Sequence, residues 1–278
     1  MVNQYREADG ILVNSFLALE PLAFESLMIK NEEENQETET IPPVYPVGPL
    51  IWDIPGEDLA SSDHPCLRWL DEQPSGTVLC VSFGSGGTLS HIQTRELAYG
   101  LEMSGKRFMW VLKNPNDALV SSTYFNQHAK YDPREYLPEG LCDRTSQIGL
   151  VVTQWVPQVQ ILSHGSTGGF LTHCGWNSSL ESIVKGVPLI AWPLFAEQNL
   201  NAVLLTEDLK VAIRVRPNEE GIVQRDQIAM LVWHLIEGEE GKALRERMKI
   251  LISTATVASD KQGSLTEERA KLSQTWKG

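Results

Sequence analysis

Residues 155–198 read WVPQVQILSHGSTGGFLTHCGWNSSLESIVKGVPLIAWPLFAEQ, and this stretch decides the fold. The segment GGFLTHC in its middle is typical of a buried strand, and VPLIAW predicts a second one. Between them, a helix opened by Asn177, Ser178 and Ser179 is predicted to end at Gly186, because glycine readily adopts the left-handed conformation that follows a helix. The stretch is therefore a strand–turn–helix–strand unit. In open α/β sheets such units bind ligands at the carboxyl ends of their strands.

Polar side chains stand where this unit would bind a ligand. The first backbone N–H groups of the helix after Trp176 have no intrahelical partners, and with the helix dipole they favour a phosphate. His173 ends the preceding strand, where its ring can donate to a phosphate oxygen. Glu181, one turn into the helix, suits sugar hydroxyls, as do Glu197 and Gln198 after the second strand. These groups predict a site for a phosphorylated sugar.

Trp155 opens the stretch and offers an indole face on which a planar base can stack, a contact worth ~1–3 kcal/mol per base. A base stacker, a phosphate donor and acceptors for sugar hydroxyls together describe a nucleotide-sugar site. None of these residues supports that interpretation alone. Their occurrence together, in this order along the chain, does.

Each of these residues also has a purely structural interpretation. Ser178-x-x-Glu181 is a capping box, in which Glu181 bonds back to the start of the helix, and this interpretation is favoured when the pair is considered alone. A lone histidine after a strand is more often a satisfied structural group than a phosphate donor. Trp155 and Trp176 are equally suited to packing, and Glu197 to a solvated face.

The whole block resembles the signature box of the plant family 1 UDP-glycosyltransferases, in length and in nearly every marker position. A match of this length is far more specific than a lone glycine motif. The resemblance implies an α/β fold with a Rossmann-like, doubly wound parallel sheet, the C-terminal domain of a GT-B enzyme whose two such domains enclose a cleft. Residues 117–139 are similar to members that glucosylate hydroquinone and monolignols. The implied activity is inverting transfer of glucose from UDP-glucose to a small phenol.

The resemblance also implies a role for each residue of the donor site. From base to sugar, these are Trp155 and the backbone of Val156 for uracil, Gln158 and Glu181 for ribose, Ser85, His173, Asn177, Ser178 and the Gly175–Trp176 backbone for the diphosphate, and Glu197 and Gln198 for the sugar. A final glutamine is associated with glucose donors. Most members carry Asp where Glu197 stands; the carboxylate is retained, one methylene further out. The donor is a substrate, and the resemblance implies no metal and no other cofactor.

Between residues 77 and 215, six strand-like segments alternate with helical ones, which predicts a parallel, doubly wound sheet. The predicted strands are residues 77–83, 107–112, 149–154, 168–173, 187–192 and 211–215. Ser85 lies in the glycine-rich loop after the first of them; taken alone, that loop indicates only a tight turn between strand and helix. Residues 114–140 form a long polar segment, which either overhangs a binding cleft or is an insertion.

We expect four segments. Residues 1–40 resemble a remnant of the N-terminal acceptor domain, although a self-sufficient β–α unit is an alternative. The Pro-rich residues 41–60 predict an interdomain linker. Residues 61–258 form the donor-binding domain, and residues 259–278 form a last charged helix.

The composition of the chain limits the classes of partner that we expect it to bind. The formal net charge of −13 argues against nucleic acid and anionic membranes as general partners, because both need a basic surface. The four cysteines form no CxxC pair, so structural zinc is not expected. No apolar run approaches the ~18 residues of a membrane helix, and no signal peptide opens the chain. These features predict a cytoplasmic protein without membrane insertion.

No catalytic base can be assigned from the sequence. The resembled family carries a catalytic His, polarised by an Asp, in its N-terminal acceptor domain, and none of the six histidines stands in that setting. His173, committed to phosphate, is poorly placed to remove a proton from the acceptor. We therefore expect binding of UDP and UDP-glucose with little or no turnover by the chain alone. A standalone nucleotide-sugar-binding module is the alternative, and a sugar-nucleotide epimerase is a weaker one.

Overall fold

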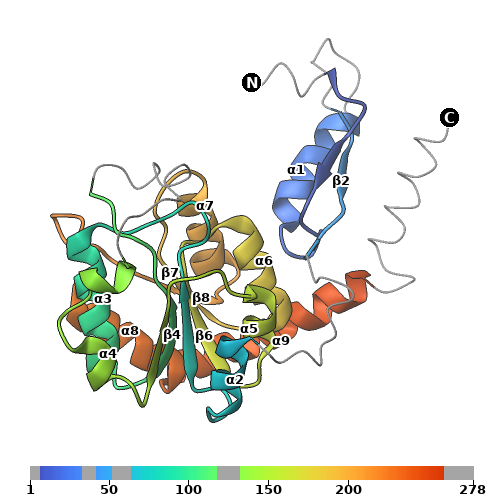
Figure 1. Cartoon of the computed structure of the whole chain (residues 1–278). Helices are drawn as coiled ribbons and strands as arrows, with labels where there is room; N and C mark the ends of the chain where they lie inside the picture. The colour runs from blue at the N-terminus through green and yellow to red at the C-terminus, as the bar shows by residue number, and fades with distance from the viewer. Residues whose placement is uncertain (1–6, 33–41, 52–63, 118–131, 260–278) are drawn as a thin grey trace. The chain divides into compact units, whose positions relative to one another are not determined.

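The computed structural model describes residues 7–32, 42–51, 64–117 and 132–259 (Figure 1). The chain divides into two compact units, residues 1–52 with 250–278 and residues 53–249. The predicted boundaries at residues 40, 60 and 258 stay predictions, and the predicted helix 259–278 lies almost entirely outside the described residues.

The smaller unit contains a short parallel pair of strands and a helix among its described residues. These are β1 (Ile11–Val13), α1 (Pro21–Glu32) and β2 (Val44–Pro46), with Ile11 opposite Val44. Asn14, directly after β1, accepts a hydrogen bond from the Leu50 backbone N–H at 2.7 Å. The segment predicted as an extended linker thus contributes β2.

The larger unit is built on a six-stranded parallel sheet with the order β5-β4-β3-β6-β7-β8 in the described residues. The strands are β3 (Val78–Ser82), β4 (Arg107–Val111), β5 (Gly149–Val152), β6 (Thr167–Thr172), β7 (Leu189–Ala191) and β8 (Ala212–Arg214). All six predicted strands are confirmed, most with slightly shorter bounds. Every residue of β3 is buried, because helices cover both faces of the sheet and a parallel strand inside such a sheet has no solvated face.

Helices on both faces complete the larger unit (Figure 1). They are α2 (Pro65–Asp71), α3 (His91–Ser104), the 3-10 helix η3 (Pro133–Tyr136), α4 (Leu141–Arg144), α5 (Gln158–Ser163), α6 (Trp176–Lys185), α7 (Gln198–Val203), the π-helix η4 (Leu204–Asp208), α8 (Arg225–Ile236) and α9 (Glu239–Ser259), whose last residues belong to the smaller unit. α3 and α8 cover one face, where buried Leu97 and Leu101 join Ile228 and Leu231 in the hydrophobic core. α5 and α6 cover the other face.

The order of the strands reverses in the middle of the sheet. From β3 the chain moves outward to β4 and β5, and then returns to the other side of β3 as β6 before continuing to β7 and β8. The connections that leave β3 and β6 therefore diverge at their carboxyl ends. In doubly wound sheets this switch point is where ligands bind.

None of the helices in the described part of the chain is both long enough and apolar enough to cross a membrane.

Candidate functional site

A polar pocket of about 310 Å³ opens at this switch point. It is lined by the loop after β3, the end of β6, the first turn of α6 and the loop before α7. The lining residues are Gly84, Ser85, Gly86, Gly87, His173, Gly175, Trp176, Asn177, Ser178, Phe195, Glu197 and Gln198. The pocket thus joins all the residues that the resemblance assigned to diphosphate and sugar, including Ser85 from a separate strand.

The imidazole of His173 lies between two glycines. A Cβ atom at Gly84 would stand 2.4 Å from Cε1 of the ring, and one at Gly175 would stand 2.4 Å from Nε2. Gly84 also has a φ of +69°, a left-handed conformation that glycine adopts without steric cost. The two glycines therefore let the histidine ring sit against the backbone of both segments predicted to bind phosphate.

His173 is neutral at physiological pH. Its pKa is lowered to about 4, first by burial and then by the positive charge of Lys113, while the charge of Glu197 acts in the opposite direction. A neutral imidazole has one N–H donor and one acceptor nitrogen. His173 can therefore donate one hydrogen bond to an anionic oxygen without carrying a charge itself.

Helix α6 begins at Trp176, one residue before the predicted start, with Gly175 as its N-cap. The predicted capping box at Ser178 is wrong, because Ser178 lies inside the helix and the N-cap is Gly175, which has no side chain. Gly186 ends the helix with a φ of +73°, as predicted. A helix start that faces a polar pocket is suited to an anion because backbone dipoles converge there.

The carboxylate of Glu181 turns toward α5. One oxygen accepts a hydrogen bond from Gln158 Nε2 at 2.7 Å, and the same nitrogen lies 3.0 Å from Ser178 Oγ. Burial raises the pKa of Glu181, and the bond from Gln158 partly offsets this. Ser178 also lines the pocket, so it links the pocket to the two residues predicted to hold ribose.

Trp155 leaves most of its indole free. The side chain is 74% exposed, although tryptophan usually packs inside, whereas Val156 beside it is buried. Trp155, Val156, Gln158 and Glu181 do not line the pocket itself. They lie around the start of α5 and on α6, adjacent to the pocket at Ser178.

Gln198 has a structural role that the sequence did not reveal. Its side chain is buried, and Oε1 accepts hydrogen bonds from the backbone N–H groups of Leu194 at 2.9 Å and Phe195 at 3.1 Å. Only the Nε2 group of Gln198 remains to donate to a ligand. Glu197, by contrast, is exposed at the start of α7, directly after Ala196 with its φ of +53°.

Lys113 lies beside the pocket but was not identified by sequence reasoning. It follows the end of β4, and its Nζ donates to the carbonyl oxygen of Gly84 in the loop after β3. Burial lowers its pKa to about 8. Its position directly after a strand that neighbours β3 was the available clue, since the carboxyl ends of parallel neighbours lie at one edge.

His91 forms a pair with Asp117 away from the pocket lining. Nδ1 of His91 lies 2.5 Å from Asp117 Oδ2, and Asp117 Oδ1 accepts from the His91 backbone N–H at 2.9 Å. Both side chains are exposed. The pKa of Asp117 is lowered, first by that backbone N–H group and then by the imidazole. The carboxylate satisfies a donor in the first turn of α3, so the pair fastens residue 117 to this helix.

Several known proteins are similar to this chain. A family model described as UDP-glucoronosyl and UDP-glucosyl transferase matches residues 43–226. A hydroquinone glucosyltransferase of Rauvolfia serpentina is 54% identical over 98% of this chain and 56% of that protein. The structure of Phytolacca americana UGT2 complexed with UDP-2fluoro-glucose and pterostilbene has a TM-score of 0.84 and 48% identity, over 100% of this chain and 56% of that one.

A third similar structure, TcCGT1 in complex with UDP, has a TM-score of 0.88 and 44% identity, covering 99% of this chain and 57% of that one. The chain thus spans about half the length of the curated relatives and solved structures it matches.

Proposed function

The chain belongs to the plant family 1 UDP-glycosyltransferases, and from this premise we propose that it is the donor-binding half of a glucosyltransferase. The proposed reaction transfers glucose from UDP-glucose to a hydroxyl group of a small phenol, with inversion at the anomeric carbon. Relatives named for hydroquinone and complexed with pterostilbene support a phenolic acceptor. We also propose a cytoplasmic location, by analogy with the resembled family.

The observation that carries the proposal is the pocket at the switch point between β3 and β6. The glycine loop after β3 and the start of α6 enter it from two separate strands, with His173 between them. Backbone dipoles and a neutral imidazole donor suit a diphosphate. We propose that these groups, rather than a metal ion, stabilise the negative charge of the diphosphate.

The remaining donor contacts extend on either side of the diphosphate. We propose that Trp155 stacks on uracil and the Val156 backbone pairs with its edge, while Gln158 and Glu181 hold ribose. The exposure of Trp155 and the acceptor oxygens of Glu181 support this order. On the other side, Glu197 accepts hydroxyls of the sugar.

In the transfer, the bond between the anomeric carbon and the β-phosphate oxygen breaks, and UDP leaves with the electron pair. A new bond forms between that carbon and the phenol oxygen, whose proton passes to a general base. Protein groups aimed at the departing phosphate stabilise the charge that develops there. No residue of this chain is proposed as the base. In this proposal residues 1–40 belong to the acceptor domain, 41–60 to the linker between the domains, and 259–278 to a final helix.

The test is calorimetric titration of the 278-residue chain with UDP-glucose, beside a glucosylation assay on hydroquinone. We expect binding with little or no turnover. If the chain binds and turns over rapidly, a base exists in these residues and the donor-half proposal is wrong. If a folded chain does not bind, the assignment of the pocket to UDP-glucose is wrong. A nucleotide-sugar-binding module would bind and still lack activity when a homologous acceptor domain is fused to it.

A further inference from the structure

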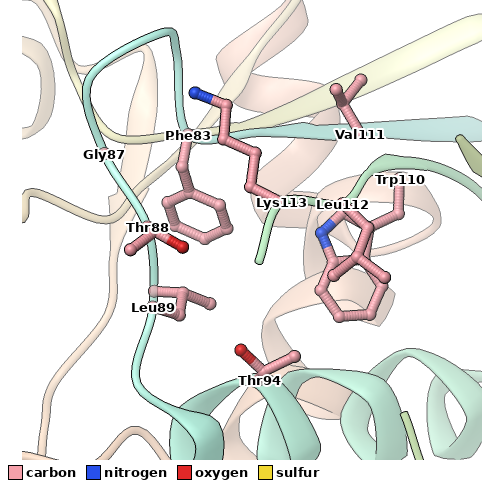
Figure 2. Close-up of a pocket in the computed structure, with 9 residues that line it drawn as sticks. All are labelled: Phe83, Gly87, Thr88, Leu89, Thr94, Trp110, Val111, Leu112 and Lys113. Carbon is pink, nitrogen blue, oxygen red and sulfur yellow. The ribbon is translucent and has the colours of Figure 1, made fainter. Parts of the chain in front are cut away.

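Lys113 places a positive charge behind the phosphate-binding loop. The residue follows β4, the neighbour of β3 on the side away from β6. Its side chain is half-buried, and Nζ donates to the carbonyl oxygen of Gly84. Figure 2 shows the lysine stretched toward the loop that runs from Phe83 to Gly87, with its nitrogen beside the loop.

The side chains that surround Lys113 carry no charge. It lines a small pocket with Phe83, Gly87, Thr88, Leu89, Thr94, Trp110, Val111 and Leu112 (Figure 2). None of these side chains carries a charge, and no carboxylate pairs with Lys113 among the described residues. A half-buried ammonium group without an anionic partner is costly unless something else compensates it.

The polar pocket lies across the loop from Lys113, where a bound anion could compensate the charge of the lysine. Gly87 lines both the small pocket and the polar pocket, so the loop is the wall between them. The field of Lys113 crosses this wall, because its charge lowers the pKa of His173. An anion bound beside His173 would therefore be attracted by the same positive charge.

We propose that Lys113 is a positioning residue for the donor diphosphate: it holds the Gly84 carbonyl on the inner side of the loop and places an uncompensated positive charge behind the phosphate. Turned inward, this carbonyl does not present its negative end to the phosphate. The inference rests on the proposed function, since it concerns the same pocket, but it assigns a residue from outside the signature box.

The charge of Lys113 gives the proposal a distinctive pH dependence. Because its pKa is about 8 without ligand, roughly half of the molecules carry neutral Lys113 at pH 8. A diphosphate favours the charged form, so binding at that pH takes up protons and affinity falls as pH rises further. The ionisable groups nearest the pocket are His173 and Glu197. His173, with a pKa of about 4, does not titrate there. The terminal phosphate of UDP is already ionised above pH 8.

The experiment measures UDP affinity by calorimetry for the wild-type chain and three variants: Lys113→Met, Lys113→Arg and Lys106→Met. Lys106 lies before β4, at the opposite end of the sheet, and pairs with Glu237 at 2.6 Å. Lys106→Met therefore controls for the loss of one charge. We expect Lys113→Met to weaken UDP binding about tenfold or more at pH 7, and Lys106→Met to leave it unchanged. Thermal melts confirm that each variant is folded.

Proton uptake separates a charge effect from loss of loop shape. At pH 8 the binding enthalpy of wild type should depend on the ionisation enthalpy of the buffer, and that of Lys113→Arg should not, because arginine stays charged. Equal affinity of Lys113→Met and wild type, or wild-type binding without proton uptake at pH 8, would overturn the inference while leaving the proposed function intact. Failure of the wild type to bind UDP contradicts the proposed function itself. If Lys113→Met does not fold, the proton uptake of Lys113→Arg and of wild type at pH 8 is compared instead, and equal uptake by the two would overturn the inference.

Discussion

Gly84 and Gly175 illustrate how tightly single residues constrain the site. Both pack against the ring of His173, so neither position has room for a side chain. The local sequence around them indicates only turns, and the reason for the glycines becomes visible when the ends of β3 and β6 are brought together. The histidine is held by backbone on both sides and keeps one orientation. A fixed donor loses little entropy when a ligand binds.

Gly84→Ala is predicted to weaken both folding and UDP binding. The left-handed backbone costs alanine ~1–2 kcal/mol, and the new Cβ displaces His173 from the pocket. Gly76→Ala is the matched control, because Gly76 has a φ of +68° with nothing within 4 Å of the added Cβ. The control should lose stability without losing affinity. Urea unfolding and UDP calorimetry on both variants make the comparison; equal UDP affinities would show that the contact with His173 is unimportant.

Glu181→Gln is predicted to raise stability at pH 7 and to lower UDP affinity. The folded protein disfavours the ionised carboxylate, so the wild-type side chain contributes stability below its ordinary pKa of 4.5 and loses it as pH rises through the raised folded pKa. Glutamine avoids this loss and still accepts from Gln158. The gain should therefore appear between pH 4 and 7 and vanish in stronger acid.

Denaturant unfolding across this pH range, with UDP titrations at pH 7, measures both effects. If Glu181 served the helix rather than the ligand, the substitution would reduce stability and leave affinity unchanged. Glu181 accepts its hydrogen bond from Gln158 on α5, and the N-cap of α6 is Gly175, so the structure speaks against a capping role.

At the scale of elements, the loop between β7 and α7 depends on one side chain. Gln198 holds the Leu194 and Phe195 backbone from the first residue of α7, and the loop carries Glu197 to the edge of the pocket. The glutamine associated with glucose donors is thus also a loop anchor. Its acceptor oxygen fixes the loop, and its amide nitrogen is left for the proposed sugar contact.

Gln198→Glu and Gln198→Ala should separate these two functions. Glutamate keeps an acceptor for both backbone N–H groups but loses the donor, so UDP affinity should persist while the added affinity for the glucose group falls. Alanine leaves two backbone donors unpaired and should cost ~1–3 kcal/mol of stability for each that stays buried. Calorimetry with UDP and UDP-glucose, and thermal melts, distinguish the two variants. Unchanged UDP-glucose binding by Gln198→Glu would contradict a sugar contact.

For the whole molecule, sequence reasoning predicted the sheet well because its information is local. Apolar runs such as residues 78–82 indicate a buried strand, and turn residues such as Gly186 indicate a helix end, without information from distant segments. The order of residues in the signature box likewise predicted which groups meet in the pocket. The predicted start of α6 was one residue too late. The predicted capping box was also wrong, because the pattern Ser178-x-x-Glu181 fits a helix start and a helix interior equally well.

Contacts between distant segments were beyond such reasoning. Lys113 reaches a carbonyl 29 residues earlier in the chain, and Gln158 reaches Glu181, 23 residues later. The first pair arises when parallel strands align their carboxyl ends at one edge, and the second when α5 packs against α6. The predictions for residues 118–131 lie outside the described part of the chain.

The most direct test of the central claim is an amide NMR spectrum of the chain, recorded with and without UDP. The account predicts that the largest shifts fall on two separate segments, residues 84–87 and 175–178, which meet only at the switch point of the sheet. Gly76 and Gly105, at the opposite end of the strands, should not move. Binding that shifts neither segment, or only one of them, would contradict a diphosphate site between β3 and β6.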